Sequence, residues 1–319
     1  MEFFHNVNVD WLGKKWYFLA FSLIFSTAGI ISMGWHWAHI GSPVPLGVDF
    51  KGGTQLQVGF TQHPNISQIR AAMDAAGERD SSIVQFGPAA NNELLISLPE
   101  VKNENALDVG REKIETALNK QYSGAFTIQG GQVVGPTVGN QLEKQAAMAT
   151  LWSMLGMLIY LWFRFQLIYG VAAVVACVHD TLITIGAFSL AERELSLTVI
   201  AAILTLVGYS MNDTIVVFDR IRENLRLSRR EPLADLVNRS INQTLSRTVL
   251  TSGLTFLTVL SLFIFGGQVL NGFSFALVIG ILIGTYSSIA VASPMLVAWQ
   301  EYRARSGKAA ALPAARRTR

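Results

Sequence analysis

Six long apolar segments alternate with polar stretches along the chain. The first, Trp16–Trp35, carries no formal charge, and the other five lie at 146–163, 167–190, 195–218, 248–267 and 273–299. A helix needs about 20 apolar residues to cross the hydrocarbon core of a bilayer. We therefore predict an α-helical integral membrane protein with six transmembrane helices. The first spans residues 16–37, and the other five form a bundle over residues 145–300.

The first segment has an alternative interpretation as a cleaved signal peptide, because Lys14 and Lys15 precede it. Its apolar run is longer than the usual apolar region of such a peptide. The residues after it, Trp35–His39, are largely aromatic and offer no clear small-x-small cleavage site. We favour a transmembrane helix.

The polar segment between the first two membrane helices, residues 38–144, has the patterns of a small folded domain. Apolar residues two apart predict strands, and apolar residues three or four apart predict helices. The predicted strands are Thr54–Phe60, Ser81–Phe86, Glu93–Leu98 and Ala125–Val134, and the predicted helices are Ile66–Ala76 and Asn105–Lys120. This βαββαβ order is that of a ferredoxin-like α+β domain.

Two glycine-rich runs flank this domain. In the first, Lys51 precedes Gly52 and Gly53 and a strand follows, whereas a phosphate-binding loop needs Gly-Lys-Ser/Thr at the start of a helix. We therefore favour a tight turn with a positive φ at one of these glycines. The second run begins with Gly135 and Pro136, and we expect it to interrupt the chain before the second membrane helix.

Composition agrees with a membrane protein. Half of the 319 residues are hydrophobic and 15% are charged, whereas soluble domains contain about 25% charged residues. The single cysteine, Cys177, excludes an intrachain disulfide, and the net charge of +3 is too small to indicate a nucleic-acid partner.

The positions of Lys and Arg predict the orientation in the membrane. If segment 1–15 is cytoplasmic, sixteen basic residues lie on the inner side, seven of them in the loop 219–247 and six in the tail 301–319. The two short outer connections then hold only Arg193. We therefore expect both termini in the cytoplasm and residues 38–144 outside.

The inner loop 219–247 combines basic residues with an apolar periodicity. Pro232 suits the first turn of a helix, and five apolar residues after it fall on one face: Leu233, Leu236, Val237, Ile241 and Leu245. This pattern is typical of an amphipathic helix on the inner leaflet of membrane lipid. A solvated basic loop that only fixes the topology is the alternative.

Charged residues inside membrane helices are functional candidates, because an Asp at the centre of such a helix costs about 2.5–3.5 kcal/mol. Asp213, next to Asn212, lies in the fourth predicted helix, and Arg247 opens the fifth. A buried acid beside a cation suits a proton carrier, so we favour that role over a structural polar clamp. Arg247 has a second interpretation as an anchor that obeys the positive-inside rule.

Other polar and small residues suggest further roles. Thr251 and Thr255 follow Arg247 on one helical face and either carry water or join helices. His179 and Asp180, in the middle of the third helix, are either a second relay station or a neutral buried pair. Gly280 and Gly284 belong to a small-residue face that also includes Gly272, Ala276 and Ser288. That face predicts close helix contact, within the bundle or with a partner subunit.

Taken together, these stretches resemble the SecF members of the SecD/SecF family of protein-export membrane proteins, within the resistance-nodulation-division superfamily. The matching stretches are Val48–Thr54 with Asp49, Val134–Gly139, His179–Asp180, Ala201–Asn224 and Ser246–Thr248. The glycine runs alone are weak signals, but the stretch around Asp213 is long and specific. The resemblance extends from Val7 to about Gln300.

The resemblance implies half of a pump, in which SecD supplies the other six helices and a larger external domain. It implies that the pair uses the proton-motive force in the bacterial inner membrane to help preproteins emerge from the SecYEG channel. SecA drives the preproteins in, and YajC and YidC are further candidate partners. Asp213 and Arg247 match the transport-critical pair of that family.

The resemblance also limits the alternatives. Protons are the expected coupling ion, and we expect no cofactor, no metal and no enzymatic activity, because no nucleophile–base pair is evident. The alternative function is a non-transporting assembly subunit that stabilises SecD and the Sec channel. A small-molecule or lipid exporter of the same superfamily is less favoured, because such pumps usually join two six-helix halves.

Overall fold

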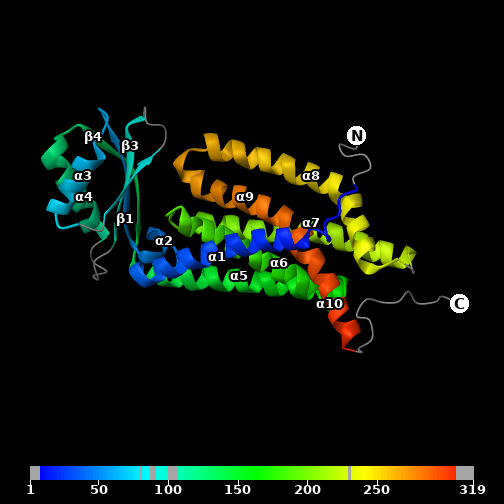
Figure 1. The fold of residues 1–319 in the computed structure, drawn as a ribbon. Helices are drawn as coiled ribbons and strands as arrows, with labels where there is room; N and C mark the ends of the chain where they lie inside the picture. The colour runs from blue at the N-terminus through cyan, green and yellow to red at the C-terminus, as the bar shows by residue number, and fades with distance from the viewer. Residues whose placement is uncertain (1–7, 79–80, 87–90, 100–106, 229–230, 307–319) are drawn as a thin grey trace.

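The computed structural model describes residues 8–78, 81–86, 91–99, 107–228 and 231–306. They form a small α/β domain at one end of a bundle of long helices (Figure 1). The predicted N-terminal segment lies partly, and the predicted basic tail largely, outside these ranges.

The bundle contains the six long apolar helices that the sequence predicts. Within the described residues, six helical segments are long and apolar enough to cross a membrane. The first five are α1 (Lys15–Ile40), α5 (Pro136–Arg164), α6 (Leu167–Leu190), α7 (Leu197–Leu227) and α8 (Leu233–Phe265). The sixth comprises α9 (Gly267–Ser287), one π-helical turn (Ser288–Ala292) and α10 (Ser293–Arg305).

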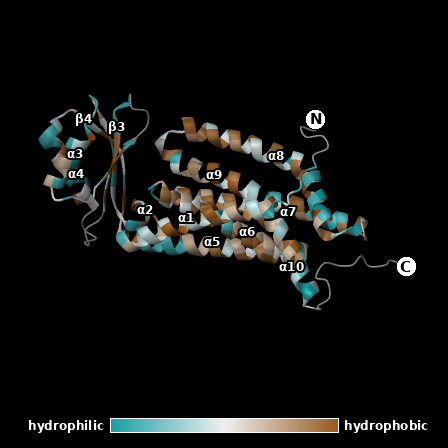
Figure 2. Ribbon diagram, in the orientation of Figure 1, coloured by the Kyte–Doolittle hydropathy of each residue, from teal (hydrophilic) through white to brown (hydrophobic). Residues whose placement is uncertain are grey.

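The six helices divide into an inner and an outer set. About half or more of the most apolar stretch is buried in α6, in α7 and in the last span, but much less in α1, α5 and α8. Apolar side chains on the outer three helices therefore face away from the chain, as expected beside lipid or another membrane subunit. Hydrophobic residues predominate along the long helices of the bundle (Figure 2).

Small residues allow the inner helices to approach closely. A Cβ atom added to Gly280 of α9 would lie 2.4 Å from Leu206 of α7, and one added to Gly284 would lie 3.0 Å from Ser210. Gly29 of α1 and Gly186 of α6 meet in the same way, backbone against backbone. The small-residue face of α9 thus packs against α7 of the same chain.

The α/β domain has the predicted ferredoxin-like topology. Its elements are β1 (Gly53–Phe60), α3 (Ile66–Ala75), β2 (Ser82–Phe86), β3 (Glu93–Pro99), α4 (Leu107–Tyr122) and β4 (Phe126–Val134). All strand pairs are antiparallel, in the order β2-β3-β1-β4. Ile69 and Met73 of α3 and Ile114 and Leu118 of α4 pack with Ile96 in its core. The predicted start of the second helix, at Asn105, lies outside the described residues.

The boundary between the α/β domain and the second membrane helix differs from the prediction. The second membrane helix begins at Pro136, with Gly135 as its N-cap, so residues 136–144 belong to this helix and not to the preceding domain. Proline suits this position because its fixed φ is already helical and its missing N–H would have no partner in the first turn.

Residues 219–247 contain the helix predicted after Pro232, but the prediction that its apolar face lies on membrane lipid is wrong. Helix α7 continues to Leu227 and α8 begins at Leu233, so only a short turn separates them. The apolar face of α8 packs in the bundle core through Leu236, Val237 and Ile241. The periodicity is correct, but the extended end of α7 covers this face in place of lipid.

Polar side chains fix this end of the bundle. Asn224 of α7 donates to Ser240 of α8 at 2.8 Å. The backbone N–H of Trp11 donates to Asn238 of α8 at 2.8 Å, and the indole Nε1–H of Trp11 donates to Asn242 at 2.9 Å. The segment before α1 is thereby attached to α8.

The first glycine-rich run forms the joint between the α/β domain and the bundle. It contains the single-turn helix α2 (Val48–Lys51). After it, Gly52 has φ 74° and Gly53 has φ 132°, which confirms the predicted tight turn into β1. A Cβ atom added to Gly139 of α5 would lie 2.5 Å from the Phe50 carbonyl oxygen, so the first turn of α5 packs directly on this backbone.

Asp49 connects this joint to the start of α7. Its Oδ2 accepts the Leu197 backbone N–H at 2.8 Å, and its Oδ1 accepts Gln132 Nε2 at 3.0 Å. A carboxylate at a helix N-terminus also interacts favourably with the helix dipole. Next to it, Gly47 N–H donates to the Leu195 carbonyl at 2.9 Å and Leu195 N–H donates to the Pro45 carbonyl at 2.8 Å. The α/β domain therefore holds the first residues of α7.

We expect Asp49→Ala to lower the free energy of unfolding by about 0.5–2 kcal/mol, as loss of a helix cap does. Thermal unfolding of the detergent-solubilised protein measures the change. Asp49→Asn should lose less, because its amide oxygen still accepts the Leu197 N–H. Equal melting temperatures for wild type and Asp49→Ala would contradict this role.

Candidate functional site

The first candidate site surrounds Asp213 at a junction of three helices. Asp213 of α7 is 2% exposed. Its Oδ2 accepts the hydroxyl of Ser252 of α8 at 2.6 Å and that of Thr285 of α9 at 3.4 Å. In this arrangement a change in the charge of Asp213 acts on the contacts of α7 with both α8 and α9.

Arg247 does not form an ion pair with Asp213 within the described part of the chain. Its side chain lies on the exposed side of α8, five residues before Ser252. Its positive charge still acts on the Asp213 carboxylate at longer range. Asn212 is also exposed, so of the predicted coupling residues only Asp213 lies inside the bundle.

The predicted hydroxyl face of α8 does not reach Asp213. Thr251 donates to the Arg247 carbonyl at 3.0 Å, and Thr255 donates to the Thr251 carbonyl at 2.9 Å. Both hydroxyls are therefore bonded to their own helix. Ser252, adjacent to Thr251, supplies the contact instead, and the sequence interpretation missed it.

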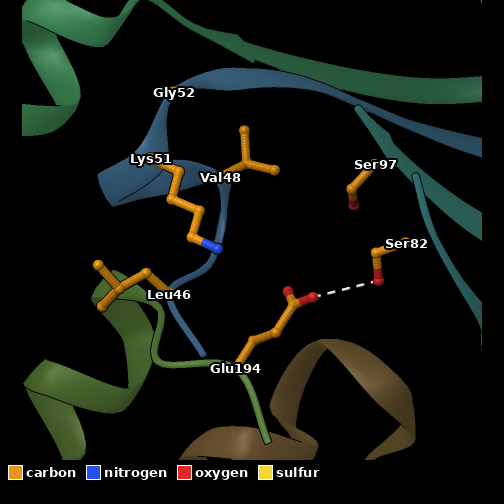
Figure 3. Close-up of a pocket in the computed structure, with 7 residues that line it drawn as sticks. All are labelled: Leu46, Val48, Lys51, Gly52, Ser82, Ser97 and Glu194. Atoms are coloured by element: carbon orange, nitrogen blue, oxygen red, sulfur yellow. Dashed lines mark hydrogen bonds between the residues drawn. The ribbon is translucent and has the colours of Figure 1, made fainter. Parts of the chain in front are cut away.

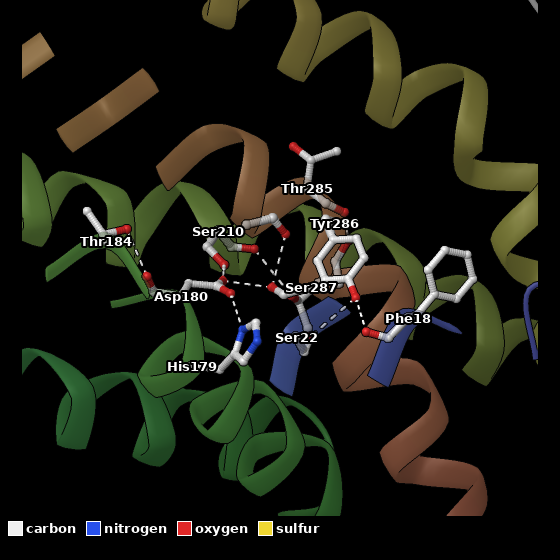
Figure 4. Close-up of polar contacts among 12 residues, drawn as sticks. Phe18, Ser22, His179, Asp180, Thr184, Ser210, Thr285, Tyr286 and Ser287 are labelled. Carbon is white, nitrogen blue, oxygen red and sulfur yellow. Dashed lines mark hydrogen bonds and ion pairs between the residues drawn. The ribbon is translucent and has the colours of Figure 1, made fainter. Parts of the chain in front are cut away.

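The second candidate site surrounds Asp180 of α6, which is 1% exposed. Its Oδ2 accepts the hydroxyls of Ser210 of α7 at 2.5 Å and Ser287 of α9 at 2.7 Å. Its Oδ1 lies 3.0 Å from Nδ1 of His179. Figure 4 shows these side chains converging on the carboxylate from three directions. The structure thus brings the predicted pair together and adds two serines.

The two buried acids share two helices. On α7, Ser210 contacts Asp180 and lies one turn before Asp213. On α9, Thr285 contacts Asp213 and Ser287 contacts Asp180. The stretch Gly284–Ser288 contains four hydroxyl residues in succession within a mainly apolar helix. This clustering is the sequence signal that could have located the partners of the two acids on α9.

The helix changes its hydrogen bonding directly after these residues. Residues Ser288–Ala292 form a π-helical turn, a rare feature that often occurs at functional sites. Tyr286, in the same stretch, donates to the Phe18 carbonyl of α1 at 2.5 Å and lies 3.2 Å from the Ser22 hydroxyl. Helix α1 is thereby attached to the segment that contacts both acids (Figure 4).

A cavity of about 350 Å³ lies at the junction of the α/β domain and the bundle. The side chains of Lys51 and Glu194 point into it from opposite sides (Figure 3). Ser82 of β2 donates to Glu194 Oε1 at 3.2 Å, which adds a second link between the domain and the α6–α7 connection. Arg193 in that connection lies over the Phe275 ring at 4.3 Å and contacts Asn271, so the connection is also held by α9.

Within the described ranges, no three His, Cys, Asp or Glu side chains come together as ligands of a metal ion. Hydroxyl groups of neighbouring helices, in contrast, contact both buried carboxylates.

A helical bundle with buried carboxylates, joined to a ferredoxin-like domain between its first two helices, defines a multi-pass membrane protein of the transport class. The chain belongs to the SecD/SecF family of protein export membrane proteins. The model of the SecD/SecF C-terminal region matches residues 113–302, and the model of the SecD/SecF GG motif matches residues 40–62. The second match covers the joint at Asp49, Gly52 and Gly53.

Individual relatives agree with this family. The chain is 53% identical to protein translocase subunit SecF of Koribacter versatilis, over 97% of this chain and 96% of the relative. It is 44% identical to the SecF subunit of Desulfurispirillum indicum, over 92% of each. The crystal structure of SecDF, a translocon-associated membrane protein from Thermus thermophilus, matches with a TM-score of 0.80 and 37% identity. The match covers 93% of this chain and 39% of that one.

We expect Ser252→Ala to destabilise the bundle by about 1–3 kcal/mol, because it removes a donor from a buried carboxylate. Thermal unfolding in detergent tests this expectation. Ser261→Ala is the matched control, since Ser261 lies on the exposed side of the same helix. Equal losses in the two variants would show that Ser252 does not stabilise Asp213.

Proposed function

We propose that this chain works with SecD as a proton-coupled subunit that promotes late preprotein translocation through the SecYEG channel. SecA, YajC and YidC are candidate further partners. The observation that carries this proposal is Asp213, a carboxylate buried in a membrane bundle and bound by hydroxyls from two neighbouring helices. Family membership supports the export role.

The proposed coupling step begins at Asp213. A proton arriving from the outer side neutralises the carboxylate, which weakens its hydrogen bonds from Ser252 and Thr285 and removes its long-range attraction to Arg247. Helix α7 then shifts against α8 and α9. The shift reaches the α/β domain through Leu195 and Asp49, which connect the start of α7 to the joint.

The energy available sets a limit on this step. One charge that crosses 100 mV supplies about 2.3 kcal/mol. A complete switch from 1:99 to 99:1 needs about 5.5 kcal/mol. One proton therefore biases the helix arrangement, and a pH gradient or a second proton completes the switch.

The deciding experiment measures gradient-dependent release of a preprotein from vesicles that contain SecYEG, SecD and this chain, with SecA and ATP supplied. Asp213→Asn should abolish the gradient-dependent part and leave the SecA-dependent part unchanged. Asp219→Asn, an exposed acid on the same helix, should retain both. Equal copurification with SecD is required of all variants.

A wild-type rate in Asp213→Asn would favour the assembly-subunit alternative. That alternative has lost one supporting argument, because the small-residue face of α9 packs against α7 of this chain. The outer apolar faces of α1, α5 and α8 remain available for SecD.

Arg247 gives a separate prediction. If its charge acts on Asp213 at long range, Arg247→Gln should reduce gradient-dependent release and Arg247→Lys should retain most of it. Release under the same conditions measures both. Equal loss in the two variants would instead indicate a requirement for the guanidinium group itself.

We also propose an inner-membrane location with the α/β domain outside and both termini cytoplasmic, as the basic residues favour. Single cysteines test this orientation, because the native Cys177 is buried. Ser123→Cys in the α/β domain should react with an impermeant maleimide in intact spheroplasts. Leu227→Cys, at the exposed last residue of α7, should react only after permeabilisation, and the reverse pattern would contradict the orientation.

A further inference from the structure

We propose that His179 and Asp180 form a second proton-binding site in the bundle, separate from Asp213. This inference rests on the proposed function, because it adds a site to the same coupling process. Asp180 contacts Ser210 and Ser287, whereas Asp213 contacts Ser252 and Thr285. The two carboxylates therefore share no donor.

Both oxygens of the Asp180 carboxylate have hydrogen-bond partners. Two hydroxyls occupy one oxygen, and Nδ1 of His179 lies 3.0 Å from the other. Such a site stabilises either a carboxylate or a carboxylic acid, since each serine hydroxyl can donate or accept. The same side chains can therefore stay hydrogen-bonded in both protonation states, with longer hydrogen bonds to the neutral acid than to the carboxylate.

His179 supplies the observation that points to a ligand. Its side chain is 14% exposed, and its Nε2 atom is buried with no hydrogen-bond partner in the part of the chain that the structure describes. When Nδ1–H donates to Asp180, Nε2 carries a free lone pair. A buried acceptor without a partner is unfavourable, and Nε2 is the free position of the pair at which a further proton can bind.

The proposed step is a proton uptake without any other reactant. With Asp180 ionised and His179 neutral, the pair has a charge of −1. One proton, taken from the outer side, binds to Nε2 while the Nδ1 proton passes to the Asp180 carboxylate, which leaves a neutral pair with a protonated Asp180. Release of that proton to the inner side restores the starting state.

Few other titratable groups lie on the helix segments that contact His179 and Asp180. Asp180 interacts electrostatically with Cys177 of its own helix. Helix α7 carries Asp213 one turn after Ser210, and α9 carries Tyr286 next to Ser287, with its hydroxyl donating to α1. Within the described part of the chain, no Lys or Arg lies within ion-pair distance of Asp180.

The two proton sites are positioned to affect each other. Ser210 and Asp213 move together because they lie one turn apart on α7. Thr285 and Ser287 move together on α9, immediately before the π-helical turn. Protonation of Asp180 therefore alters the positions of residues that hold Asp213.

Infrared difference spectroscopy after a pH jump tests this inference on the intact complex of this chain with SecD in liposomes. The wild type should show a carboxyl band with two components. Asp180→Asn should remove one component, Asp213→Asn the other, and the double variant both. Asp219→Asn, an exposed acid, is the control for a nonspecific change.

His179→Gln is the second variant. The glutamine amide can still donate a hydrogen bond to Asp180, but it does not bind a proton as an imidazole does. It should shift the pH at which the Asp180 component appears and shift the pH profile of gradient-dependent release in the same direction. A merely structural His179 would leave both unchanged in His179→Gln.

An unchanged carboxyl band in Asp180→Asn, with the His179→Gln profile equal to that of wild type, would overturn the second site. Loss of the Asp180 component together with wild-type release in Asp213→Asn would retain the second site and reject the proposed role of Asp213. The two failures are therefore distinguishable.

Discussion

A carboxylate inside a membrane must take its hydrogen bonds from the helices around it, because lipid chains offer none. This constraint determines how the bundle is arranged. Serine and threonine hydroxyls from α7, α8 and α9 converge on Asp180 and Asp213. The small residues of α9 let α7 approach closely enough for these contacts to form. The polar contacts and the close packing therefore depend on each other.

The position of the α/β domain and that of the bundle also depend on each other, through α7. Asp213 lies in the middle of α7. Asp49 binds the first residue of this helix, Leu197, and backbone hydrogen bonds from the joint hold Leu195 just before it. Because α7 has 31 residues, it is about 46 Å long at 1.5 Å per residue. A rigid element of that length can transmit a shift at its centre to its end. The glycine-rich run thus makes the contact between α7 and the α/β domain, and the positive φ values at Gly52 and Gly53 provide its tight turn into β1.

The sequence allowed the helices and the βαββαβ domain to be predicted, because hydropathy and periodicity determine them directly. It also located Asp213 and Asp180, since an acid in an apolar helix is conspicuous. It did not locate Ser252 or Ser287, because hydroxyl residues are common in membrane helices and only the rotation of each helix selects the inward ones. The 219–247 error has a related cause, since an apolar face does not reveal whether lipid or another helix covers it.

In the proposed mechanism, two proton-binding acids change the energetic argument for coupling. One proton that crosses 100 mV supplies about 2.3 kcal/mol, so two supply about 4.6 kcal/mol. A nearly complete two-state switch needs about 5.5 kcal/mol, and a modest pH gradient covers the difference. A single site would leave more than half of that free energy to be found elsewhere. Two sites connected through α7 and α9 bring the driving force close to what the helix movement requires, and they act on the same pair of helices.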